Sequence, residues 1–336
     1  MDNYEMYYQS PYDSSENTKG YFETVVEPLL TPGKEGDLCE WLKSVGLISR
    51  EMKCQQPECG EETLTWSKAR VVDKHNWCCP KCKKKVPIRQ GSFLSEFKCD
   101  LSYAVRGIQS WCNSLPVEDI CDQKSLKPNV AKRIYSQCSA VAEWYINNHP
   151  ETSQLGGPEA VIIVDVFPDG CMMLTPHNNN YSKRILCIAD TNHIPTRVWA
   201  KILDSKDNSK IVDAVLAHVM LGSTIVTSQG LYSDLLQVKG MTDIISTDAL
   251  MSLDPLDDQK SLKNLETIWA MTVNVCQQIQ ELSNSNGEQL LRELQWRQIY
   301  GSSPLENILH HIVKYNAVNA PEKYALPSQT NHEILL

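Results

Sequence analysis

Apolar residues follow a helical spacing in the first half of the chain and a strand-like spacing after residue 155. Those of residues 38–47 recur on one helix face, and Gly46 stands where such a helix would stop. Residues 99–148 show the same helical period over a longer stretch. Residues 50–92 are rich in cysteine and basic residues instead, which predicts short strands around a metal ion.

The region after the turn cluster Leu155-Gly156-Gly157-Pro158 alternates between strand and helix patterns. Strands are predicted at 159–167, 171–177, 184–190, 197–204, 222–228 and 241–247, and helices at 210–221, 260–283, 287–301 and 304–316. This order is typical of a mixed α/β domain.

The pattern therefore divides the chain into five segments. They are a flexible acidic tail (1–36), a helix plus a zinc ribbon (37–98), a helical segment like a helix-turn-helix (99–154), the mixed α/β domain (155–316) and a flexible tail (317–336). The first segment is assigned as flexible because its many Tyr, Ser, Asn and acidic residues are too polar to bury one face.

Composition narrows the class of protein. The chain has 336 residues, enough for a proper core without disulfides, and contains no apolar run of about 18 residues that could span a bilayer. Its N-terminus has neither the basic start nor the apolar run of a secretory signal. We therefore expect a nuclear or cytosolic protein without a membrane partner, whose 13 cysteines stay reduced and can serve metal binding.

Four cysteines have the spacing of a zinc site. Cys54 and Cys59 form one pair and Cys79 and Cys82 a second, some twenty residues later, and two such pairs on hairpin turns can surround one zinc ion. Cys78 is an alternative ligand to Cys79, and a set of buried reduced cysteines is the alternative to any metal. Because all four ligands would be thiolates, the zinc would be structural.

Charge is distributed unevenly. The net charge of -9 argues against a protein that coats nucleic acid nonspecifically, yet residues 50–106 hold 12 Lys and Arg against 7 Asp and Glu, an excess of 5. The residues predicted to contact DNA are Lys81, Lys83, Lys84, Lys85 and Arg89 beside the ribbon, and Lys132 and Arg133 near the start of a recognition helix. A solvated lysine face and a helix that only packs on the core are the alternatives.

Five motifs in sequence resemble the Merlin-superfamily transposases and their bacterial insertion-sequence relatives. They are WCCPKC with its following helix, LGGPEAVIIVDVF, GSTIVTSQGLYSDL, SLDPLDDQKSLKNLETIW and LLRELQWRQIY, which together extend over roughly residues 38–315. The resemblance implies an RNase H-like domain in 155–316 that holds two divalent metal ions with three acidic residues, the DDE arrangement.

The acid set that the resemblance implies is incomplete. Asp165 matches the first acid and Glu266 the third, but Ser228 and Gln229 stand at the second, and Lys263 lies near Glu266. A neutral amide cannot help to anchor Mg²⁺, so catalysis is expected to be lost. Asp234 is expected on the following helix, facing elsewhere.

The leading prediction is a domesticated, catalytically inactive transposase that acts as a nuclear DNA- or chromatin-associated factor. Its expected partners are DNA, chromatin or nuclear proteins, and a second copy of the chain. One alternative is an active metal-dependent transposase or nuclease, which alone would need Mg²⁺. The other is a protein-interaction scaffold that no longer binds DNA.

Overall fold

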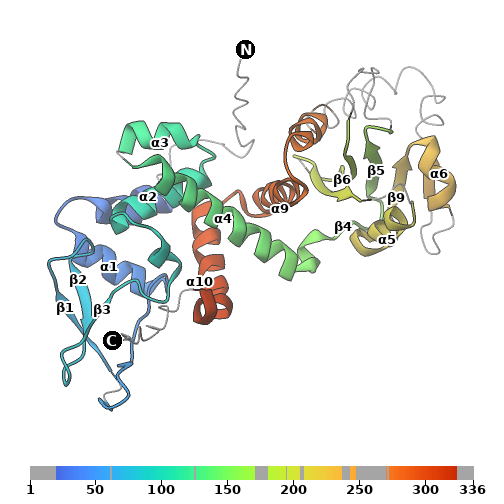
Figure 1. The fold of residues 1–336 in the computed structure, drawn as a ribbon. Coiled ribbons are helices and arrows are strands. Elements are labelled where there is room, and N and C mark those ends of the chain that lie inside the picture. The colour runs from blue at the N-terminus through green and yellow to red at the C-terminus, as the bar shows by residue number, and fades with distance from the viewer. Residues whose placement is uncertain are drawn as a thin grey trace, which may run out of the picture. The chain divides into compact units, whose positions relative to one another are not determined.

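The computed structural model describes residues 20–60, 63–124, 126–170, 181–193, 195–204, 208–236, 243–246, 270 and 272–323. They form two compact units, one from the described residues up to 145 and from 300 onward, and the other from those between 146 and 299 (Figure 1). The architecture is mixed α/β, as the sequence pattern predicts. The strand predicted at 171–177 lies outside the described residues.

The first unit begins with two short helical turns, η1 (Phe22–Val26) and η2 (Glu27–Leu30), and the helix α1 (Glu35–Ser44). Val26 and Leu30 are buried, and the indole N–H of Trp41 on α1 donates to the hydroxyl of Tyr21 at 3.1 Å. The prediction of a flexible tail up to residue 36 is therefore wrong for 20–36, because these apolar side chains pack on α1.

A three-stranded antiparallel sheet of β1 (Thr65–Lys68), β2 (His75–Cys78) and β3 (Lys85–Pro87) follows. After η3 (Phe93–Glu96) come the helices α2 (Leu101–Cys112), α3 (Val117–Lys124) and α4 (Pro128–Asn148). Gly107 lets α2 approach α4 closely, since a Cβ there would meet Ile134 Cδ1 at 2.8 Å.

The last helix, α10 (Pro304–Lys323), belongs to this first unit and contacts α2 and η3. Its buried residues Leu305, Ile308, Leu309 and Ile312 have the i, i+3, i+4, i+7 spacing of one apolar face. The sequence pattern places 304–316 in the α/β domain and calls 317–336 a tail, and the structure corrects both for the described part of α10. Periodicity shows that a helix has an apolar face but not what covers it.

The second unit is built on a five-stranded mixed sheet in the order β10-β9-β5-β6-β7. The central strand β5 (Val161–Phe167) pairs antiparallel with β6 (Arg184–Asp190), which pairs antiparallel with β7 (Arg197–Leu203). On its other side β5 pairs parallel with β9 (Thr224–Thr227), and β9 with β10 (Asp243–Ser246). A two-stranded parallel sheet joins β4 (Leu155–Gly156) to β8 (Val219–Met220), and η4 (Pro150–Ser153) precedes it.

Helices cover both faces of this sheet (Figure 1). Alternation along β5 directs Ile162, Val164 and Val166 toward α5 (Ser209–His218) and α6 (Gln229–Leu235). Ile163 and Phe167 point to the opposite face, which is covered by the helical residues 272–280 and by α9 (Asn284–Tyr300). Asp165 lies two residues from both Ile163 and Phe167, so alternation along the strand points its side chain to the same face.

No helix in the part of the chain that the structure describes combines the length and the apolar character needed to cross a membrane.

Candidate functional site

Four cysteine thiols meet at one end of the three-stranded sheet. Cys54 and Cys59 lie in the loop before β1, and Cys79 and Cys82 form a tight turn between β2 and β3. The Sγ atoms of Cys54 and Cys82 are 3.7 Å apart, those of Cys59 and Cys79 are 3.5 Å apart, and all four ligand atoms lie within 4.8 Å of one another. The cluster is a four-thiol cage.

Local backbone geometry makes this cage. The N–H of Cys82 donates to Cys79 Sγ at 3.4 Å, and the N–H of Lys83 donates to the Cys79 carbonyl at 3.1 Å. Lys83 and Gly60, which each follow a cysteine turn, both have positive φ, at 60° and 64°. These turns direct each pair of thiols to the same point.

The cage fits a tetrahedral metal ion. Zinc–sulfur bonds of about 2.3 Å at tetrahedral angles place neighbouring sulfurs about 3.8 Å apart, close to the spacing found here. The four cysteines could therefore hold a metal ion such as zinc, with no position left for water. Cys78 lies outside this group, and its Sγ is instead 3.8 Å from the carbonyl of Cys79 and 3.9 Å from that of Lys83.

The surroundings of Cys79 and Cys54 shift the pKa values of these two thiols in opposite directions. Burial opposes ionisation of Cys79, but the backbone N–H of Cys82 and neighbouring groups lower its pKa to about 7. For Cys54 the N–H of Gln56 favours the thiolate, whereas burial and the other three thiols raise the pKa to about 12. A metal ion must displace protons from such a cluster, so its binding releases protons.

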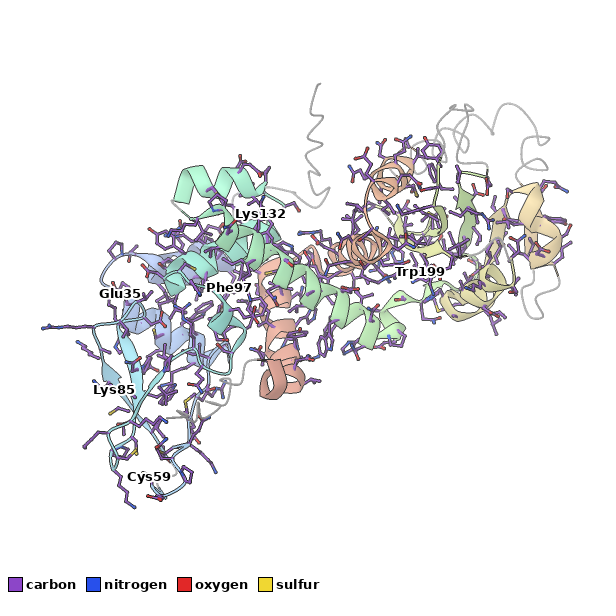
Figure 2. All side chains as sticks on the ribbon, viewed as in Figure 1. Glu35, Cys59, Lys85, Phe97, Lys132 and Trp199 are labelled. Atoms are coloured by element: carbon purple, nitrogen blue, oxygen red, sulfur yellow. The ribbon has the colours of Figure 1, made fainter. Side chains whose placement is uncertain are left out.

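Lysines surround the second cysteine turn, and all four predicted there are exposed: Lys81, Lys83, Lys84 and Lys85. Figure 2 labels Lys85. The Lys81 ammonium donates to the Cys59 carbonyl at 2.6 Å and that of Lys83 to the Pro80 carbonyl at 2.6 Å. The two other ammonium groups form no hydrogen bond or ion pair with any described residue. We call these four residues the lysine turn.

Arg89 does not belong to that basic surface. It is buried, and its guanidinium forms an ion pair with Asp73 and donates to the carbonyls of Leu94, Phe97 and Cys99. The prediction that Arg89 contacts DNA is wrong, because the side chain joins the ribbon to the segment before α2. A charge count missed this role because Asp73 lies 16 residues earlier in the chain.

Replacing Arg89 by lysine is expected to lower stability without changing charge. The ammonium group of lysine cannot replace all the N–H donors of the planar guanidinium. At least one buried carbonyl therefore loses its donor, at a cost of about 1–3 kcal/mol. Urea unfolding of the Arg89→Lys variant measures the loss, and Arg70→Lys, at an exposed position of the same region, serves as the control. Equal stabilities for the two variants would contradict the assigned role.

Lys132 and Arg133 are exposed near the start of α4. Arg133 Nε donates to Glu96 Oε2 at 3.1 Å, and its Nη2 contacts the same oxygen. The structure thus leaves Lys132 open to a partner, while Glu96 orients the exposed Arg133 through an ion pair.

The first of the three expected acids is deeply buried. Asp165 has no exposed surface, and its Oδ1 accepts the N–H of Val166 at 2.9 Å. A Cβ on Gly170 would overlap the carboxylate, so the turn after β5 packs directly against it. On the neighbouring strand the residue opposite Asp165 is Cys187, whose Sγ is 3.9 Å from that of Cys276.

The sheet also places the second expected position beside Asp165. Thr227, at the end of β9, is in register with Val164, so Ser228 and Gln229 follow at the level of Asp165. Gln229 is exposed at the first position of α6. Asp234 lies on α6, as expected, and accepts a hydrogen bond from Asn208 at 2.7 Å. Glu266 and Lys263 lie outside the described residues.

Thiols lie on the side of Asp165 that faces β6, because Cys187 is opposite it and Cys276 contacts Cys187. Hydrogen bonding to Cys276 and complete burial raise the pKa of the Cys187 thiol well above its ordinary value. A neutral thiol is a poor ligand for Mg²⁺, which prefers oxygen.

The surroundings of His218 predict that the stability of the second unit depends on pH. Burial, followed by the charge of Arg292, lowers its pKa to about 4, and the ring stacks on Trp199 with centroids 4.0 Å apart. Between pH 6.5 and 4 the unfolded state binds the extra proton, so stability should fall as pH falls through this range. His218→Phe, which keeps the stack, should flatten the pH dependence of urea unfolding between pH 7.5 and 4.5, and His310→Phe should not.

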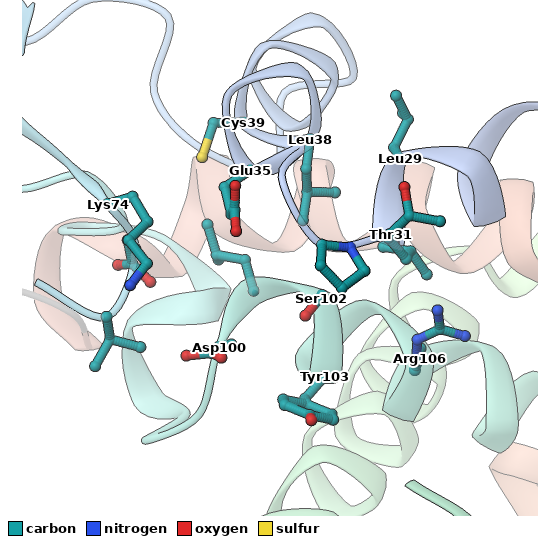
Figure 3. A pocket seen from close by; sticks show the side chains of 15 residues that line it. Leu29, Thr31, Glu35, Leu38, Cys39, Lys74, Asp100, Ser102, Tyr103 and Arg106 are labelled. Atoms are coloured by element: carbon teal, nitrogen blue, oxygen red, sulfur yellow. The ribbon is translucent and has the colours of Figure 1, made fainter. Parts of the chain in front are cut away.

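A cavity of about 380 Å³ lies in the first unit, between η2, α1, the β1–β2 turn and the start of α2. Figure 3 shows Lys74 and Arg106 on opposite sides of it. Glu35, Asp73 and Asp100 also line it, so its charges of both signs favour no single class of ligand. The cavity arises from the packing of distant segments, and no sequence motif marks it.

Comparison with protein-family models, with curated proteins and with solved structures found no match to this chain.

Proposed function

We propose that this chain is a transposase-derived DNA-binding protein without catalytic activity, located in the nucleus. A structural zinc ion in the four-thiol cage stabilises the ribbon, the lysine turn and α4 contact DNA, and the second unit is an RNase H-like domain whose acid set is incomplete. Protein partners in chromatin and a second copy of the chain fit the same role.

The observation that carries the DNA-binding proposal is the lysine turn. Four exposed lysines lie on or directly after one tight turn, which the metal cage would hold rigid. Clustered Lys and Arg neutralise phosphates and release counterions, and this is the main source of affinity for a DNA backbone. Because the whole chain has a net charge of -9, affinity for DNA requires local basic surfaces such as this turn.

Two features support an inactive RNase H-like unit. The mixed sheet brings the end of β9 next to the strand that carries Asp165, where the resemblance requires a second acid, and the residue there is the neutral Gln229. Asp165 itself is covered by the turn at Gly170 and faces a thiol. A divalent metal pair needs several converging oxygen ligands, which these described residues do not supply.

Random-site selection with the full, zinc-loaded chain tests the proposal. We expect enrichment of a DNA sequence at physiological salt. Failure to retain any DNA would contradict the proposal, and capture of protein partners that survives nuclease treatment would then favour the interaction scaffold.

A further inference from the structure

The helices α2, α3 and α4 form a three-helix module whose core fixes the orientation of α4. The indole N–H of Trp111 on α2 donates to Ser139 Oγ on α4 at 3.2 Å, and Tyr135 of α4 donates to the Leu115 carbonyl at 2.8 Å. Only residues 125–127 separate α3 from α4. A three-residue connection is typical of a helix-turn-helix, in which the helix after the turn enters the major groove.

One face of α4 is buried and the opposite face is open. Ala131, Ile134 and Cys138 have no exposed surface. At 100° per residue the exposed residues of the N-terminal half, apart from Pro128 at the first position, fall within an arc of about 100° on the other side of the helix. They are Asn129, Lys132, Arg133 and Ser136.

This exposed face has the chemistry of base recognition. It contains an amide, two cations and a hydroxyl and no acidic residue, and the first acid on the same face is Glu143, about two turns later. Asparagine can bond adenine through two hydrogen bonds, whereas lysine and arginine bind guanine or phosphate. Arg133 donates to the Glu96 carboxylate through both Nε and Nη2 of its guanidinium, which fixes the plane of that group.

We propose that α4 reads DNA sequence in the major groove and that Asn129 is a specificity-determining residue that recognises an adenine. Asn129 lies in the first turn of the helix, where recognition helices meet base edges. Lys132 supplies affinity beside it, and Arg133 is the oriented second reader. This inference rests on the proposed DNA-binding function and adds to it the residue that selects a base.

Random-site selection with three forms of the full, zinc-loaded chain tests this inference. The forms are the native chain, Asn129→Ala and Asn147→Ala, the last being an exposed asparagine near the other end of the same helix. We expect Asn129→Ala to lose the preference for adenine at one position of the motif by about 5- to 150-fold. The other positions, and the motif of Asn147→Ala, should not change.

The outcomes separate this inference from the proposed function. If the native chain retains no DNA, the proposed function itself fails. If the native chain selects a motif that Asn129→Ala leaves unchanged, or if it binds DNA without any preference, DNA binding stands and the assignment of Asn129 is overturned. A thermal unfolding curve of Asn129→Ala that matches the native one ensures that a changed motif reports recognition.

Discussion

Removal of the metal ion is expected to unfold the ribbon while the second unit stays folded. The apolar core of the ribbon contains little besides Leu64, Trp77, Val86 and two of the cysteines, and its strands have only three or four residues each. Such a small core cannot offset the loss of chain entropy on folding unless a cross-link such as a bound metal ion stabilises it. A structural zinc ion contributes about 10–16 kcal/mol of apparent folding free energy, which is far more than this core supplies.

Serine variants of the neighbouring residues Cys79 and Cys78 test this expectation, because only Cys79 belongs to the cage. Cys79→Ser should lose the bound zinc, measured as metal content per chain, and should become sensitive to limited proteolysis between residues 50 and 90. Cys78→Ser should keep one zinc ion and native resistance, because its thiol lies outside the cage. Loss of zinc in both variants, or in neither, would contradict the assignment of the four ligands.

Replacement of Lys83, Lys84 and Lys85 by alanine is expected to weaken DNA binding by roughly 100-fold at 0.15 M salt if each ammonium contacts one phosphate. The slope of log affinity against log salt concentration should become shallower by about 2.7. The physical reason is the release of fewer counterions. Zinc content should not change, because these side chains are not ligands.

A charge-matched variant completes this second test. Lys34, Lys201 and Lys210 are exposed lysines that do not belong to the lysine turn, and their replacement by alanine removes the same total charge. The control should keep the native affinity and salt slope to within about twofold, since long-range effects of net charge are screened at this salt concentration. If the two triple variants weaken binding equally, the lysine turn is not the contact surface.

The sequence predicts best those features that depend on residues close together in the chain. The cysteine spacing predicts the four residues that the structure gathers, since each pair lies on a single turn and turn geometry follows from a few residues. The strand pattern likewise predicts β5, β6, β7, β9 and β10, whose alternation reflects two covered faces.

Features that depend on distant partners could not be predicted in the same way. Arg89 looks like one more basic residue until Asp73 and three backbone carbonyls are seen around it. The apolar face of α10 is visible in the sequence, but its place in the first unit is not. The burial of Asp165 also depends on the pairing of β5 with β6, which places Cys187 opposite it.

The proposed loss of catalysis is tested by incubating one end-labelled duplex that carries the selected sequence with the zinc-loaded chain in Mg²⁺ or Mn²⁺. We expect the protein to retain the duplex in a native gel and the DNA to run at full length in a denaturing gel. Cut or joined strands that disappear in Asp165→Asn would show an active enzyme and contradict the central claim.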